Sequence, residues 1–100
     1  MNRKEMLSIL SENGLTRFQK DVLMETLSIP KGKTATYKEI AAKVGKPGAY
    51  RAVGTALKKN PLPIVIPCHR VIKTNGELGN YSGGGTKRKK ELLKSEHAIL

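Results

Sequence analysis

Closely spaced start and stop signals for short helices constrain the fold of this sequence most. Thr36 and Glu39 form a capping box, in which each side chain satisfies a backbone N–H group that a helix start leaves unpaired. Gly45 can end that helix in the left-handed conformation, Pro47 can start a second helix, and Asn60-Pro61 stops it. Two short helices separated by three or four residues that include a glycine predict a helix-turn-helix.

Three further helices are predicted around this unit. Residues 2–12 have helical apolar periodicity, and a capping box at Thr16 and Gln19 opens a helix that must end before Pro30. A last helix is expected over about residues 86–96. The 100 residues suit one domain, spanning 1–100, because a chain this short has little room for a second core.

A small β structure is predicted after the helix-turn-helix. The dipeptide Asn75-Gly76, between residues 71–74 and 77–81, is a strong hairpin signal. The apolar run Ile64-Val65-Ile66 is expected to be buried. A hairpin that follows a helix-turn-helix resembles a wing, so the predicted fold is mainly α with a small β-hairpin, a winged helix-turn-helix DNA-binding domain.

Charge favours a polyanionic partner. The net charge is +11, of which residues 31–60 carry +7, residues 61–100 carry +4 and residues 1–30 carry none. A surface tuned only for solubility mixes the two signs, so this bias favours nucleic acid over a merely basic surface. Basic residues 87–90 at the start of the last helix oppose its dipole and suggest a nearby anion, with helix fraying or a simple solvated patch as the alternative.

The second helix of the predicted helix-turn-helix presents a basic face. Helical periodicity turns one set of residues inward, namely Ala52, Val53, Ala56 and Leu57. It turns another set outward, namely Arg51, Gly54, Thr55, Lys58 and Lys59. Such a low, basic face could approach a DNA groove closely, whereas the alternative interpretation is an ordinary solvated helix.

The single cysteine, Cys68, is either a small buried residue or a reactive thiol. One cysteine excludes an internal disulfide, and with only His69 and His97 beside it the chain lacks the usual ligands of structural zinc, so we expect no metal and no cofactor. Cys68 and His69 can cooperate only if the backbone turns between them or a water bridges them, because neighbours in an extended chain point to opposite faces. Adjacency alone therefore favours a structural thiol beside a surface imidazole.

The longest purely apolar run, Ile64–Val65–Ile66, is far too short to cross a bilayer, which takes about 20 residues. No signal-peptide pattern follows the basic residues near the start. We therefore expect a cytoplasmic or nuclear protein, associated with the nucleoid if prokaryotic, with no membrane contact. A monomer is expected.

Longer motifs resemble one known family. The string PLPIVIPCHRV at residues 61–71, followed by GNYSGG at 79–84, closely resembles the active-site signature of the O6-alkylguanine-DNA alkyltransferases, the methylated-DNA–protein-cysteine methyltransferases. TYKEIA at residues 36–41 and RAVG at 51–54 are similar to that family's helix-turn-helix. The resemblance covers about residues 16–97, and it is to the C-terminal catalytic domain of that family.

The resemblance implies a role for each matching residue. Cys68 would accept the alkyl group, His69 would act as a base through a bridging water, and Glu96 would orient and charge the imidazole. Asn60 would hold the turn around the site, and Tyr37 would help to rotate the nucleotide and would hydrogen-bond the base. Arg51 would enter the duplex in place of the extruded guanine. The remaining expected DNA contacts are Thr36, Tyr37, Ala52, Gly54, Thr55 and Lys58, and the expected pocket residues are Pro67, Val71, Tyr81, Ser82 and Gly83.

The resemblance also implies the reaction: direct, irreversible, single-turnover transfer of the alkyl group from O6-alkylguanine in double-stranded DNA to Cys68 after nucleotide flipping. O4-alkylthymine is a second candidate substrate. Family members usually carry a further N-terminal domain, and only about 15 residues precede the matching region, so we expect a minimal catalytic domain.

Three other functions stay open. Alkyltransferase-like proteins bind the lesion and recruit other repair factors, but they do not transfer the alkyl group. They have tryptophan in place of the acceptor cysteine, which this chain retains as Cys68. A winged-helix regulator would use Cys68 structurally. A cysteine hydrolase would leave the basic helix-turn-helix without a role.

Overall fold

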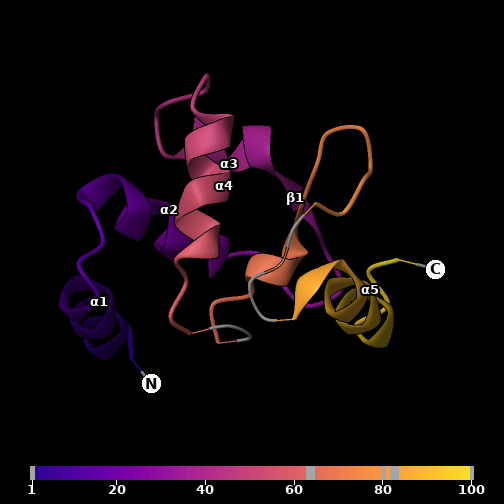
Figure 1. Cartoon of the computed structure of the whole chain (residues 1–100), viewed down its shortest axis with the longest axis horizontal. Coiled ribbons are helices and arrows are strands. Elements are labelled where there is room, and N and C mark those ends of the chain that lie inside the picture. Colours follow the sequence, from indigo (N-terminus) through magenta and orange to yellow (C-terminus); the bar gives the residue numbers. More distant parts are fainter. Residues whose placement is uncertain (1, 63–64, 80, 82–83, 100) are drawn as a thin grey trace.

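The computed structural model describes residues 2–62, 65–79, 81 and 84–99. Its helices are α1 (Arg3–Glu12), α2 (Arg17–Thr26), α3 (Tyr37–Lys43), α4 (Tyr50–Lys58) and α5 (Gly85–Ser95), and the 3-10 turn η1 spans Cys68–Arg70. Two short strands complete it, β1 (Ala35–Thr36) and β2 (Val71–Ile72). In Figure 1, α4 lies near the centre, and α1 and α5 lie on opposite sides of it.

Side-chain caps begin the first three helices, and those of α2 and α3 are the capping boxes that the sequence predicts. The Asn2 side chain accepts a hydrogen bond from the Glu5 amide at the start of α1. Both capping boxes, at Thr16 with Gln19 and at Thr36 with Glu39, are fully formed. These bonds pair amide groups that would otherwise lack a partner at each helix start, so they fix where α2 and α3 begin.

The core lies where α2, α3 and α4 pack against one another, and α4 is in contact with both of the others. Its buried side chains include Val22, Leu23, Ile40, Ala41, Val53, Ala56 and Leu57. The buried face of α4 therefore carries Val53, Ala56 and Leu57, as its periodicity predicts. Ala52, expected on that face, is exposed, so this part of the prediction is wrong.

The connection between α3 and α4 is longer than the sequence suggested. Gly45 ends α3 with a φ of +81°, as expected. Pro47 does not start α4, because the Ala49 amide donates to the Lys46 carbonyl and closes a turn with Pro47 and Gly48 at its centre. Proline followed by glycine suits the two central positions of such a turn. Six residues, 44–49, therefore separate the two helices, rather than three or four.

The β structure differs from the predicted hairpin. β2 pairs in parallel with β1, with Ala35 opposite Val71 and Thr36 opposite Ile72. The turn itself is present, since the Gly76 amide donates to the Lys73 carbonyl and the Lys73 amide donates to the Glu77 carbonyl. Gly79, with a φ of +75°, interrupts extended geometry soon after this turn, so the returning segment does not continue as a paired strand in the described residues.

The mainly helical fold is thus confirmed, with a parallel strand pair in place of the hairpin. The loop after β2 projects from the body of the molecule like a wing, and it is drawn in orange in Figure 1.

In the apolar run before the cysteine, Ile66 is buried as predicted, whereas Val65 is 47% exposed, against the prediction. Ile64 lies outside the described residues. None of the described helices is long and apolar enough to cross a bilayer.

Two valines of different exposure test the packing of α4. Val53→Ala should lower the free energy of unfolding by about 2 kcal/mol, because Val53 is fully buried between helices and its lost methyl groups leave a cavity. The matched change Val65→Ala, at an exposed site, should alter it by less than about 0.5 kcal/mol. Urea unfolding followed by circular dichroism measures both, and equal losses would contradict this description of the core.

Candidate active site

The backbone turns at the cysteine. Cys68 begins η1, where the Cys68 amide donates to the Ile66 carbonyl at 2.8 Å and the Arg70 amide donates to the Pro67 carbonyl at 2.9 Å. The sequence left open whether Cys68 and His69 lie in extended chain or in a turn. The structure answers that they lie in a turn, so the two side chains are not forced to opposite faces.

Asn60 holds the chain that leads into this turn. Its side-chain amide donates to the Ile66 carbonyl at 3.0 Å, and its Oδ1 accepts from the Leu62 amide at 2.9 Å. Asn60 is itself buried, so these bonds are protected from water. It thereby ties Leu62 to Ile66, and its role in the reaction stays a prediction.

A partly buried cluster of Arg70, Glu96 and His69 ties η1 to the end of α5. The Arg70 guanidinium donates to both Glu96 oxygens, at 2.9 and 2.7 Å, and its third bond goes to the Ile29 carbonyl. His69 Nε2 lies 3.1 Å from Glu96 Oε1. A two-point arginine–carboxylate pair has a fixed geometry, so Glu96 is itself held in place where it meets the imidazole.

The electrostatics make His69 a neutral base. Burial lowers the pKa of His69, and the Glu96 hydrogen bond opposes that effect only in part. Arg70 holds the pKa of Glu96 at about 2, so this carboxylate stays charged. The expectation that Glu96 charges the imidazole is therefore wrong. Arg70 bonds both carboxylate oxygens, and the loss of solvation on burial favours the neutral imidazole at neutral pH.

The other imidazole nitrogen remains available. Within the described part of the chain, His69 Nδ1 is buried and makes no hydrogen bond. The Tyr81 ring meets the imidazole edge-on, with centroids 6.0 Å apart and planes at 72°. Because Nε2 is occupied by Glu96, Nδ1 is the atom through which this side chain can accept a proton.

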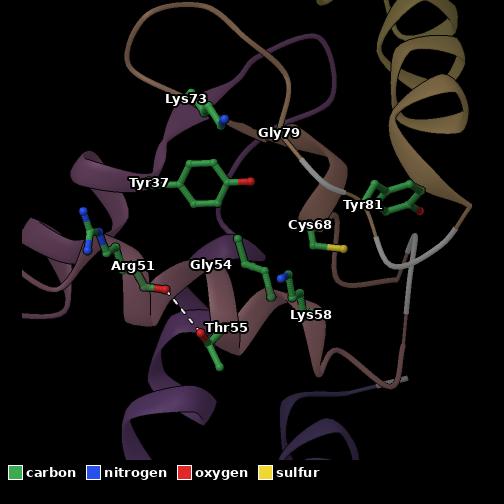
Figure 2. A pocket seen from close by; sticks show the side chains of 10 residues that line it. Tyr37, Arg51, Gly54, Thr55, Lys58, Cys68, Lys73, Gly79 and Tyr81 are labelled. Atoms are coloured by element: carbon green, nitrogen blue, oxygen red, sulfur yellow. Dashed lines mark hydrogen bonds between the residues drawn. The ribbon is translucent and has the colours of Figure 1, made fainter.

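A cavity of about 230 Å³ opens beside the cysteine (Figure 2). Cys68 is only 4% exposed, so reagents reach its sulfur through this cavity. The lining comes from α3, α4, η1 and the segment after β2: Tyr37, Arg51, Gly54, Thr55, Leu57, Lys58, Cys68, Lys73, Gly79 and Tyr81. A buried thiol of purely structural function does not need such an opening.

Two tyrosines flank the sulfur. Burial, and then the nearby Cys68, raise the pKa values of Tyr37 and Tyr81, so both hydroxyls stay protonated and can donate hydrogen bonds. Gly79 lets Tyr37 approach: a Cβ atom there would lie 2.7 Å from the Tyr37 hydroxyl oxygen, and the φ of +75° suits glycine. Gly79 therefore shapes the wall of the cavity.

Lys89 adds a buried cation. Its side chain is fully buried, its Nζ donates to the Val71 carbonyl, and it lies 5.7 Å from the centre of the Tyr37 ring. Burial lowers the pKa of Lys89 to about 8, against the opposing influence of Cys68. Since that value is above 7, the ammonium is still mostly charged at neutral pH and favours a thiolate nearby.

This placement corrects, at Lys89 alone, the interpretation of residues 87–90 as a basic patch, while the nearby anion stays a prediction. Lys89 faces inward, and Arg88 pairs with Glu91 on the surface. Lys89, Leu92, Leu93 and Glu96 recur at helical spacing and form the inward face of α5. That spacing was the signal by which the sequence could have placed Lys89 in the core beside Leu93.

The expected DNA contacts lie on one side of α4. Arg51, Ala52, Thr55 and Lys58 are exposed, and Gly54 is half-buried against Tyr37. The Thr36 hydroxyl is already used as the cap of α3.

Among the expected pocket residues, Tyr81 lines the cavity, whereas Pro67 and Val71 are buried and do not line it. Ser82 and Gly83 lie outside the described residues. The sequence did not place Lys73, Leu57 or Lys89 among the site residues, and it indicated Gly79 only as part of a motif.

Known proteins are similar to this chain in sequence and fold. Residues 17–98 match the family model described as 6-O-methylguanine DNA methyltransferase, DNA binding domain. The chain belongs to this family. The resemblance expected from its motifs is thus confirmed at the level of the DNA-binding domain.

Individual members of the 6-O-methylguanine DNA methyltransferase family are similar in sequence and fold. The methylated-DNA–protein-cysteine methyltransferase of Methanothermobacter thermautotrophicus is 50% identical over 94 residues, which are 94% of this chain and 52% of that protein. The crystal structure of Mycobacterium tuberculosis OGT in complex with DNA matches with a TM-score of 0.80 and 49% identity, over 84% of this chain and 52% of that one. S. pombe Atl1, in complex with damaged DNA containing O6-carboxymethylguanine, matches with a TM-score of 0.70 and 37% identity, over 82% of this chain and 77% of that one.

The chain spans about half the length of the first curated relatives that it matches. What those longer proteins do is therefore carried to this chain as a proposal.

The arginine–glutamate pair predicts an acid-sensitive fold. The folded-state pKa of Glu96, about 2, is below its usual value of 4.5, so its contribution to stability is complete above pH 4.5 and is lost as pH falls toward 2. In Glu96→Gln this contribution, at most about 3 kcal/mol, should be absent. Glu91→Gln, which breaks only a surface pair, is the matched control. Urea unfolding at several pH values measures the difference, and parallel curves for the parent protein and Glu96→Gln would contradict it.

Proposed function

We propose that this protein repairs DNA by transferring the alkyl group of O6-alkylguanine irreversibly to Cys68. One observation carries the proposal: the only cysteine of the chain lines a cavity that also borders the exposed basic side of α4. A thiol placed there can meet a nucleotide that leaves the duplex. In this proposal residues 1–100 act as one domain, equivalent to the C-terminal catalytic domain of longer family members.

DNA binding comes first. The net charge of +7 over residues 31–60, most of it on and around α3 and α4, suits the phosphate backbone. An alkyl carbon on guanine O6 is enclosed by stacked bases, so the nucleotide must leave the duplex before a sulfur can reach it. Arg51, exposed at the start of α4, would occupy the space left behind, and Tyr37 and Gly54 would border the path into the cavity.

The transfer step then needs a thiolate. His69 Nδ1 accepts the Cys68 proton through a water molecule, while Glu96 and Arg70 hold the imidazole in position. The Lys89 ammonium stabilises the negative sulfur.

The sulfur attacks the alkyl carbon, the new C–S bond forms as the C–O bond breaks, and the electron pair of that bond goes to guanine O6. The guanine then takes up a proton, for which the protonated Tyr37 hydroxyl is a nearby donor. The product is a thioether. Water does not cleave it, so each protein molecule repairs one lesion.

A second candidate function is lesion binding without transfer. It is favoured by one observation, the similarity to S. pombe Atl1, whose crystal structure contains damaged DNA. In that case Cys68 would have no chemical role, and recognition would recruit other repair factors. The two functions differ in a single measurable product, the alkylated cysteine.

Intact-protein mass spectrometry after mixing with O6-methylguanine duplex tests the proposal. We expect a gain of about 14 Da, which peptide mapping places on Cys68. Cys68→Ala should show no gain and should bind the same duplex with similar affinity. An unmodified parent protein that binds tightly would favour the lesion sensor, and equal loss of binding in Cys68→Ala would indicate a structural thiol.

A further inference from the structure

A second groove, of about 430 Å³, lies next to the cavity of Cys68. It is bordered by the starts of α3 and α4 and by the turn after β2. Four residues line both spaces: Tyr37, Arg51, Gly54 and Lys73. Cys68 lines only the cavity, and Figure 2 shows Cys68 and Arg51 on opposite sides of the Tyr37 ring.

The groove has an aromatic wall that the proposed reaction does not use. Tyr50 is one of the few large apolar side chains left exposed among the described residues, at 38%. Like Tyr37, it lines the groove, and the Nζ atom of Lys38 lies 5.4 Å from the centre of its ring. Two aromatic rings with a cation beside them suit a flat, π-rich ligand that is connected to an anion.

A nucleobase of DNA meets that description. If the lesion enters the cavity, Lys73 stands at the boundary between the two spaces, because it lines both of them. That is where a phosphate joining two consecutive nucleotides would need positive charge. The groove is thus arranged for the nucleotide next to the lesion, with its base against Tyr50 and its linking phosphate beside Lys73.

We propose that this groove binds the nucleobase that flanks the lesion in the same strand, and that Tyr50 stacks on it. The inference rests on the proposed function, since it takes the alkylated nucleotide to occupy the cavity of Cys68. It adds a subsite that binds the neighbouring base while the alkylated base is out of the duplex. The base opposite the lesion is not its occupant, because that base belongs to the other strand and no phosphate joins it to the lesion beside Lys73.

Variants of Tyr50 test the stacking contact. Tyr50→Ala should weaken binding to the O6-methylguanine duplex about tenfold, because a stacked base loses its aromatic partner. Tyr50→Phe keeps the ring and should remain within about twofold of the parent protein. Lys38→Ala should weaken binding more than Lys43→Ala, which removes a lysine from the other end of α3, outside the groove. Equal affinities of the parent protein and Tyr50→Ala would overturn the subsite.

Fluorescence identifies the bound base. 2-Aminopurine is placed in turn at each position flanking the lesion and at the position opposite it, and its emission is read on adding parent protein or Tyr50→Ala. We expect the emission change at a same-strand flanking position to be lost in Tyr50→Ala, and the change opposite the lesion to persist. Dependence on Tyr50 at the opposite position alone, or at no position, would overturn the proposal.

The mass gain separates failure of this inference from failure of the repair function. Tyr50→Ala should still gain about 14 Da on Cys68 when incubated with excess methylated duplex, only more slowly. If the parent protein gains no mass, the proposed function fails. If it gains mass and the aminopurine signals do not depend on Tyr50, the subsite alone fails.

Discussion

The pairing of Arg70 with Glu96 is the interaction on which the site depends. It joins the turn that carries Cys68 to the end of α5, across 26 residues of chain, and Arg70 also reaches back to the Ile29 carbonyl after α2. Three segments that are distant in sequence are thereby fixed around one thiol. Without that pair, His69 would lose the carboxylate that orients it, and α5 would lose its link to η1. Lys89, which α5 carries into the core, would then no longer be held near Cys68.

The same pair sets the charges around the sulfur. Glu96 pairs mainly with Arg70, so it orients His69 without raising the pKa of the imidazole above its usual value. Burial lowers that pKa and leaves the imidazole a neutral base. Lys89 supplies the nearby positive charge from inside the core. A thiol that has to react next to the polyanion of DNA needs both a base and a local cation. The fold provides them from two different elements.

Much of the fold follows from short-range chemistry. The caps at Thr16 and Thr36 and the glycine at position 45 act through neighbouring backbone atoms, so their patterns predict α2 and α3 well. The hairpin prediction was wrong because β2 finds its partner in Ala35–Thr36, far away in the chain. The start of α4 was misplaced because Pro47 and Gly48 suit a turn as well as a helix start. Lys89 stands among four consecutive basic residues, but its position one helical turn before Leu93 turns it into the core. The cavity itself, which depends on Gly79 and Tyr37 meeting, has no local signal.

Titration of limiting protein against excess O6-methylguanine duplex tests the central claim most directly. Counting methyl groups removed per protein molecule, with the active fraction set by thiol content, should give a plateau at about one, since the thioether on Cys68 has no route of release. A plateau near zero despite tight binding, or a count that continues to rise past one, would contradict the account.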